Sequence, residues 1–494
     1  MNSFKKAMQT NLHGTKSNLT ITENSMPTYV STLSPLLDLF YRIGNRNKSA
    51  TSDNHYIAQI FDKAYAENPD LAIKIVGWSR SIRNGAGVKQ YIRYLIEKGH
   101  INIEQIDWSW FGQEGYWKDL FYFTPDTVGD INGVLSTIKK ALDKEENLIL
   151  KYLPRRKKGK PGHKNNQWIK LLKAFLELDD RNYRRMCASF RTPETLMCAN
   201  NWEEIKYEQV PSVCMSRNRK NFSKHDKERF DKFIRLAKQV KPGEKPLIKT
   251  ETLYPHEIIK PLVGENSRMW LNRYLTSDMA DFAEAQWKSL PDKFKSDKKI
   301  LVVGDTSGSM NDGTSIYISL ALTIYCAERI TGAFHNFACT FSSRPSFIEF
   351  LDTDSLVQKI MRIPEIVSNT NIEAVFDLIL KKAVQENVPQ NEMPELILII
   401  SDMQFDSCVD NRKSLAHEMM VRKFREAGYT APNVIFWNVR NSSGVPVTMD
   451  QSGVALMSGA SPNSIKQAID GSVDPMSVLL RTVDKKEFNF LKEN

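Results

Sequence analysis

Hydrophobic positions follow a helical spacing through the first part of the chain. Apolar residues recur every three or four positions across residues 36–40, 57–64 and 92–96, and turn signals such as Asn68-Pro69-Asp70 separate these segments. Two more stretches with the same spacing lie at residues 167–190 and 225–240. We therefore predict stacked, HEAT-like helical hairpins over residues 30–296, preceded by a polar tail at residues 1–29.

After residue 296 the pattern changes to continuous apolar runs. The two strongest, residues 299–304 and 395–401, are typical of strands in a parallel sheet that is buried on both faces. Weaker strand patterns at 334–341, 346–351 and 433–438 alternate with helical patterns at 314–330, 372–383 and 414–427. Residues 297–494 are thus predicted to form a doubly wound α/β domain around an open parallel sheet.

Composition narrows the class of protein. Hydrophobic residues make up 41% of the chain and charged residues 26%, as in globular proteins, and no apolar run approaches the roughly 18 residues of a membrane span. Residues 1–20 lack the apolar segment of a secretory signal. The cysteines form no C-x-x-C pair, which favours reduced thiols over a zinc site of Cys187, Cys198, Cys214 and His225. We expect a cytoplasmic protein, in the host cytoplasm if it is viral, without a membrane partner.

The net charge of +10 is unevenly distributed along the chain. From residue 300 onward there are 17 Lys and Arg against 23 Asp and Glu, a net charge of −6, which leaves 51 against 35, or +16, before it. A basic region followed by an acidic one indicates a part that binds a polyanion and a part with a different function. Nucleic acid is the polyanion that this pattern favours.

Oxygen-bearing side chains follow the two strongest strand patterns. Asp305, Ser307 and Ser309 come directly after the first strand, Asp402 follows the second, and Thr370 lies between them ahead of a helical pattern. Ligands bind at the carboxyl ends of strands in this fold class, so we expect these side chains to converge. Carboxylate and hydroxyl oxygens suit Mg²⁺ or Mn²⁺ rather than Zn²⁺.

This pattern of D-x-S-x-S, then Thr, then Asp resembles the metal-ion-dependent adhesion site of von Willebrand factor A domains. The resemblance implies that Ser307 and Ser309 bind the ion directly, and that Asp305, Thr370 and Asp402 bind it directly or through water. It also implies a vacant coordination position that accepts an acidic group from a protein partner.

Three enzyme classes share parts of the motif. An aspartic protease needs a second carboxylate that shares the proton of Asp305, in a different fold. A serine protease needs a histidine, but His335 and His417 do not follow a buried strand. A dehalogenase-type phosphatase needs a second Asp where Thr306 and Ser307 stand. We therefore expect a protein that is not an enzyme.

Three basic clusters in the helical region are the expected RNA contacts. They combine Lys and Arg with turns, amides or an aromatic ring, which neutralise phosphate and stack on bases of single-stranded RNA. Each cluster alone is also compatible with a solvated face. The clusters are Arg80, Arg83, Lys89 and Arg93; Arg155, Arg156, Lys157, Lys158, Lys160 and Lys164; and Arg217, Arg219, Lys220 and Phe222.

A basic helical region followed by an A domain with a metal site resembles the TROVE-domain family of the Ro 60-kDa autoantigen. Residues 115–120, 183–185, 254–258 and 401–406 are more similar to an uncharacterised family, the family of unknown function numbered 2828. The TROVE resemblance implies a non-enzymatic protein that binds structured or single-stranded noncoding RNA, in a helical ring closed by the A domain. The alternative is a metal-dependent adhesion or assembly protein without an RNA role.

Overall fold

The structure is a computed structural model, and it describes residues 18–492 apart from 46–50, 145–146, 191, 241–243, 265–270, 295, 312, 342–343, 365–370, 407–414 and 441–443. Among the residues so described, no helix is both long and apolar enough to cross a membrane.

A first helical body has one continuous hydrophobic core. Polar caps start several of its helices: Ser34 accepts a hydrogen bond from Leu37 N, and Asn68 accepts one from Leu71 N. The helices are α2 (Pro35–Ile43), α3 (Thr51–Glu67), α4 (Pro69–Arg80), α5 (Gln90–Glu97), α6 (Trp110–Gln113), α7 (Pro125–Val128), α8 (Asn132–Asp143), α9 (Asn147–Tyr152), α10 (Lys164–Phe175) and α11 (Asp180–Ser189). The predicted helical character of this region is confirmed.

A second, smaller helical body follows. Its core is separate from the first and is built around Phe222 and Phe230. Helix α15 instead packs against the sheet domain, in the core that contains Ile258 and Ile259. The helices are α12 (Pro193–Cys198), α13 (Ser212–His225), α14 (Lys227–Lys238), α15 (Pro255–Ile259) and α16 (Ser277–Lys288).

The C-terminal part contains a six-stranded sheet in the order β5-β4-β3-β6-β7-β8. Its strands are β3 (Ile300–Asp305), β4 (Phe337–Phe341), β5 (Phe347–Glu349), β6 (Leu396–Ser401), β7 (Asn433–Asn438) and β8 (Val454–Ser458). The surrounding helices are α17 (Ser315–Arg329), α18 (Leu356–Arg362), α19 (Ile372–Gln385), α20 (Ala416–Glu426), α21 (Ile465–Ile469) and α22 (Pro475–Val483).

Alternate side chains of the central strands enter two different cores. Ile300 and Val302 of β3 pack in the core that includes α17 and α21, whereas Leu301 and Val303 pack in the core that includes α19 and α20. Helices therefore cover both faces, and the predicted doubly wound architecture is confirmed. Two details differ: β5 pairs antiparallel with β4, so the sheet is not wholly parallel, and the sequence pattern did not reveal β8.

Part of the segment predicted as an N-terminal tail is folded. Strands β1 (Leu19–Ile21) and β2 (Pro27–Tyr29) pair antiparallel, and Tyr29 exchanges two backbone hydrogen bonds of 2.9 Å with Val445. Met26 is buried in the core beneath the sheet. The tail prediction is thus wrong for residues 18–29, because this hairpin adds to the hydrophobic core of the C-terminal part.

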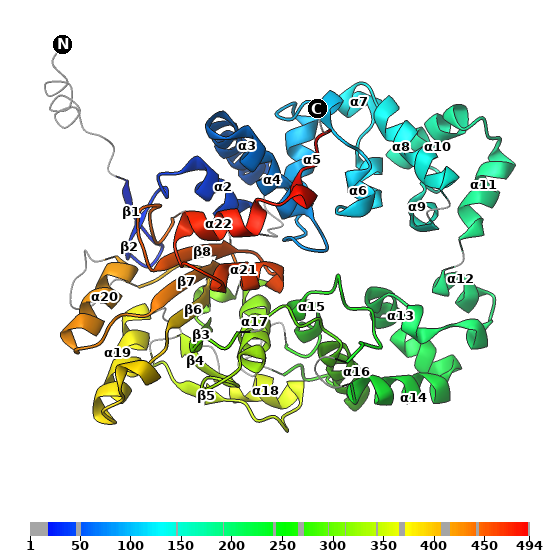
Figure 1. The fold of residues 1–494 in the computed structure, drawn as a ribbon. Helices are drawn as coiled ribbons and strands as arrows, with labels where there is room; N and C mark the ends of the chain where they lie inside the picture. The colour runs from blue at the N-terminus through cyan, green and yellow to red at the C-terminus, as the bar shows by residue number, and fades with distance from the viewer. Residues whose placement is uncertain are drawn as a thin grey trace, which may run out of the picture.

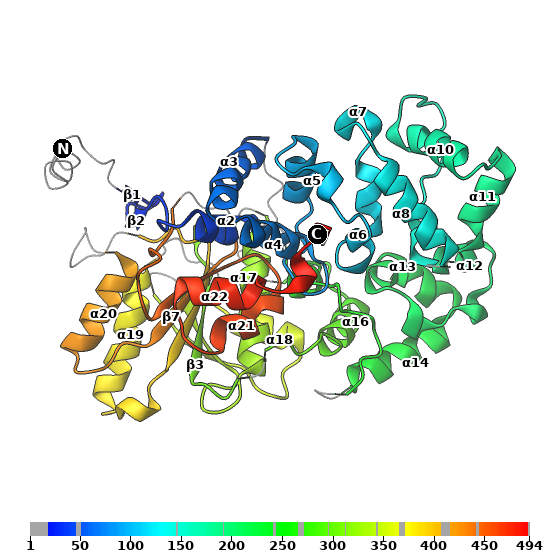
Figure 2. The ribbon, with the colours of Figure 1, turned by 45° about the horizontal axis from the view of Figure 1, so that its top comes forward.

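The chain runs in a closed circuit. Figure 1 shows the helices leading away from the sheet through α11, turning at α12 and returning through α16, and Figure 2 shows the same path. The C-terminal end completes the first helical body, because Leu479, Val483 and Phe488 lie in its core. The approach is close: a Cβ at Gly77 would lie 1.9 Å from the carbonyl oxygen of Phe488.

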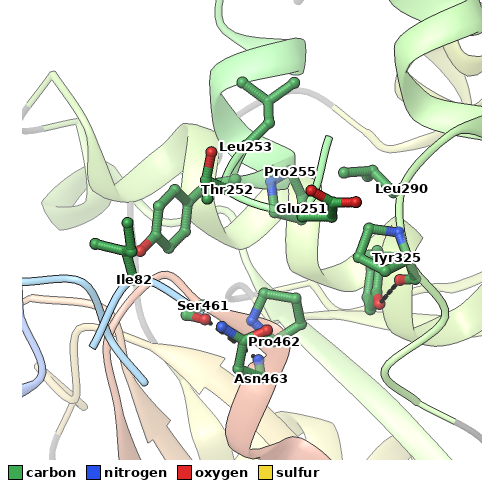
Figure 3. Close-up of a pocket in the computed structure, with 12 residues that line it drawn as sticks. Ile82, Glu251, Thr252, Leu253, Pro255, Leu290, Tyr325, Ser461, Pro462 and Asn463 are labelled. Atoms are coloured by element: carbon green, nitrogen blue, oxygen red, sulfur yellow. Dashed lines mark hydrogen bonds between the residues drawn. The ribbon is translucent and has the colours of Figure 1, made fainter. Parts of the chain in front are cut away.

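A three-way junction holds the circuit together next to α15. The Tyr254 hydroxyl donates to Ala86 O at 3.1 Å, and Asn463 Nδ2 donates to Gly85 O at 3.1 Å. Figure 3 shows the small cavity at this junction, which is lined by residues from all three parts of the chain, including Ile82 and Tyr325. Its volume of about 20 Å³ is enough for one water molecule, so the junction is tightly packed.

Candidate metal centre and basic surfaces

Two buried carboxylates lie at the carboxyl ends of neighbouring strands. Strands β3 and β6 are parallel, with Gly304 opposite Ile400, so Asp305 at the end of β3 lies beside the residues that follow β6. Asp402 comes directly after β6, and both carboxylates are fully buried. The convergence expected from the two apolar runs is therefore observed for this pair.

Hydrogen bonds from three serines surround the two carboxylates. Asp305 Oδ1 accepts from Ser307 N at 2.8 Å, and its Oδ2 accepts from the Ser401 hydroxyl at 2.5 Å. The hydroxyls of Ser307 and Ser309 are 3.1 Å apart, and Ser309 donates to Asp402 Oδ1 at 3.3 Å. Four of the five predicted metal ligands thus form one cluster, and Thr370 lies outside the described residues.

The pKa values of both carboxylates in this cluster are raised. Burial, followed by the charge of Asp402, raises the pKa of Asp305 to about 7. Burial also raises the pKa of Asp402, opposed by a hydrogen bond from Gln404 N and by Arg440. A divalent cation between the carboxylates would relieve their mutual repulsion, so the donor set fits Mg²⁺ or Mn²⁺.

Two residues of this cluster were missed by the sequence reasoning. The Arg440 guanidinium lies 3.3 Å from Asp402 Oδ2 and 3.3 Å from Ser309 O, and it follows β7, the strand next to β6. Ser401 is the last residue of β6 and points at Asp305. The rule that placed Asp402 at a strand end, extended to the next strand, would have found Arg440.

His335, weighed above as a catalytic base, has its hydrogen-bond partners outside this cluster. His335 contacts the carbonyl of Ile330 and the Asp352 carboxylate instead. The residues weighed for zinc also do not form a site, since among the described residues no three His, Cys, Asp or Glu side chains make a group that could hold a metal. Cys187, Cys198 and Cys214 are free thiols.

The first basic cluster divides into structural and exposed residues. Arg80 is 3% exposed and binds the buried Asp119 carboxylate at 2.5 Å, and Arg93 binds the other oxygen of the same carboxylate. The prediction that these two arginines contact RNA is therefore wrong for Arg80 and unsupported for Arg93, because both neutralise Asp119. Arg83 and Lys89 remain exposed.

The second basic cluster is an ordered loop with exposed side chains. Asn166 accepts from Lys157 N at 3.0 Å and donates to the carbonyls of Lys157 and Lys160, which fixes the loop backbone. The exposed basic residues are Arg155, Arg156, Lys157, Lys158, Lys160 and Lys164. Arg155 is partly engaged, since it donates to Cys187 O at 3.0 Å.

This loop lies near a basic helix, α11, that the sequence analysis did not select as an RNA contact. The pKa of the exposed Asp180 is lowered first by a hydrogen bond from Lys173, with smaller effects from Arg156 of the loop and Arg184 of α11. Arg184 therefore lies close enough to share a surface with the loop. Three arginines of α11, Arg181, Arg184 and Arg185, are exposed, and their spacing places them on one helical face.

The third cluster lies on helix α13. Phe222 is fully buried and contacts the rings of Tyr207 and Phe230, so the prediction that it stacks on RNA bases is wrong. Arg219 packs over the Phe282 ring at 5.8 Å, and burial lowers its pKa. Arg217 and Lys220 are exposed, as expected for residues that face a ligand or solvent.

The chain is similar to two domain families, to a viral protein and to a protein of known structure. Residues 22–171 and 134–300 match the model of the family described as a domain of unknown function, DUF2828, and residues 299–489 match a second domain of unknown function, DUF7788. An uncharacterized protein of Acanthamoeba polyphaga mimivirus is 29% identical over 96% of this chain and 88% of its own length. The crystal structure of the Deinococcus radiodurans RO (RSR) protein aligns with 92% of this chain and all of its own, at 14% identity and a TM-score of 0.42.

Proposed function

The chain belongs to the family described as a domain of unknown function, DUF2828, and we propose that it is an RNA-binding protein whose C-terminal domain also binds Mg²⁺ or Mn²⁺. The observation that carries the metal proposal is the cluster of Asp305, Ser307, Ser309 and Asp402 at one edge of the sheet. A divalent ion there would supply a coordination position for an acidic group of a partner. The chain's own residues hold and orient that ion.

RNA binding is proposed for the helical part on electrostatic grounds. The region before residue 300 carries a net charge of +16, and the described loop at residues 155–164 presents exposed basic side chains beside the arginines of α11. Exposed lysine and arginine side chains neutralise phosphates and release counterions. We place the RNA contact on this loop and on α11 rather than on Arg80, Arg93 or Phe222, which have structural roles.

We also propose that the protein is not an enzyme and acts as a binding protein. The hydroxyls of Ser307 and Ser309 contact each other and Asp402, an arrangement suited to ion binding rather than to nucleophilic attack assisted by a histidine base. The competing proposal is a metal-dependent assembly protein without an RNA role. It is favoured by the burial of Arg80 and Phe222, which weakens two of the three predicted RNA-binding clusters.

The salt dependence of RNA affinity separates these two proposals. Replacing Arg156, Lys157 and Lys158 by Ala leaves Arg155 and its contact with Cys187 in place. If the three side chains neutralise phosphates, the log–log slope of affinity for single-stranded RNA against salt should flatten by about two units.

A matched control is the triple Ala variant of Lys381, Lys382 and Arg425, which are exposed in the C-terminal domain. It removes the same charge far from the loop in sequence. If both variants flatten the slope equally, or if neither does, the loop is not on the RNA path. If the unmodified protein has no measurable affinity for RNA, the assembly proposal is preferred.

A further inference from the structure

Arg440 bridges two residues of the proposed metal centre. Its Nη1 atom lies 3.3 Å from Asp402 Oδ2 and 3.3 Å from the carbonyl oxygen of Ser309. Asp402 is fully buried, whereas 31% of the Arg440 side chain is exposed. The guanidinium therefore reaches from the rim of the site onto a carboxylate that would hold the ion.

The backbone of Arg440 is fixed independently of this contact. Its N–H donates to Asn438 Oδ1 at 2.9 Å, and its carbonyl accepts from Asn45 Nδ2 at 3.3 Å. Further along the same connection, Val445 is paired with Tyr29 of the N-terminal hairpin. The position of the Arg440 backbone therefore does not depend on the contact between its guanidinium and Asp402.

Charge makes the guanidinium and a divalent ion alternatives at this position. Ionised Asp305 and Asp402 carry two negative charges, which a divalent cation neutralises completely. If Arg440 stayed in place, its guanidinium would share the Asp402 carboxylate with an ion of the same sign. An arginine keeps its charge at any accessible pH, so it cannot avoid this repulsion by losing a proton.

We propose that Arg440 is a built-in competitor of the metal ion. Its guanidinium occupies Asp402 when no ion is bound, and it turns towards solvent when Mg²⁺ or Mn²⁺ enters. Arg440 thereby sets a threshold concentration, below which the site stays closed by its own side chain. This inference rests on the proposed metal site and adds to it a means of regulation.

The test is the affinity for Mn²⁺, measured by titration calorimetry. It compares the unmodified full-length protein with three single-residue variants. Arg440→Gln removes the charge, Arg440→Lys keeps it, and Arg425→Gln removes an exposed arginine of α20 as a control. We expect Arg440→Gln to bind Mn²⁺ about tenfold more tightly than the unmodified protein. Arg440→Lys and Arg425→Gln should stay close to the unmodified value. Melting curves without metal establish that each variant is folded.

The outcomes distinguish a failure of the Arg440 inference from a failure of the proposed metal site. If the unmodified protein binds Mn²⁺ and Arg440→Gln binds it equally or more weakly, Arg440 supports the site instead of competing, and the inference is overturned while the metal site stands. The same holds if Arg440→Lys binds as tightly as Arg440→Gln, since charge would then not be the cause. If neither the unmodified protein nor Arg440→Gln binds Mn²⁺, both the competitor and the metal site are refuted.

Discussion

The raised pKa of Asp305 predicts an unusual loss of stability with rising pH in the metal-free protein. Its ordinary value is 3.8, and burial together with the charge of Asp402 raises it to about 7. The folded protein therefore holds this proton more tightly than the unfolded chain does. Stability from this group is fully present below about pH 4 and is lost as the pH rises through about 7.

The magnitude follows from the size of the shift. A difference of about three pKa units corresponds to about 4 kcal/mol in the free energy of unfolding, once the pH is above both values. The variant Asp305→Asn keeps the shape of the side chain and cannot ionise. Its free energy of unfolding, relative to that of the unmodified protein, should therefore increase by up to about 4 kcal/mol between pH 4.5 and 8.

The assay compares thermal midpoints in the presence of a chelator across this pH range. For a domain of this size, the expected change in the difference between the two midpoints is on the order of 10 °C. Asp377→Asn, which removes an exposed carboxylate on α19, serves as the control for a general effect of charge. If the midpoints of Asp305→Asn and the unmodified protein differ by the same amount at every pH, the carboxylate does not hold its proton at neutral pH and the reasoning is refuted.

Two further predictions test residues that the structure places in hydrophobic or ion-paired surroundings. Asp119→Asn should cost about 3–5 kcal/mol of stability, because it leaves Arg80 and Arg93 without their shared buried carboxylate; a denaturation midpoint unchanged from that of the unmodified protein would contradict this. Phe222→Ala should cost about 3–5 kcal/mol by opening a cavity between Tyr207 and Phe230. RNA affinity measured on the folded fraction should be unchanged in this variant, whereas a selective loss of affinity would restore Phe222 as an RNA contact.

The sheet and its metal cluster could be predicted because their signals are local. Long apolar runs marked β3 and β6, and the order of strands in this fold class brings the residues at their ends together. Strand β8, between Gly453 and Gly459, was missed although it is as long as β4, which was predicted. Arg440 was missed because the strand-end rule that selected Asp402 was not extended to β7, the strand next to β6.

The basic clusters were predicted less well because charge alone does not reveal burial. Arg80 pairs with Asp119, 39 positions away, and this partnership depends on how α4 packs on the residues after α6. Phe222 stands among basic residues in sequence, but on α13 it shares the buried face with Cys214 and Met215. That amphipathic spacing was a usable signal, and it was obscured by the exposed lysines and arginines between these positions.

The most direct test of the central claim is the stoichiometry of Mn²⁺ binding, measured from the loss of the free-ion signal in electron paramagnetic resonance. The double variant Ser307→Ala, Ser309→Ala removes two hydroxyls that contact each other, one of which donates to Asp402, and it leaves both carboxylates in place. We predict one ion per chain for the unmodified protein and none for the double variant at the same concentrations. Equal binding by both proteins, or no binding by either, would contradict a metal centre at this edge of the sheet.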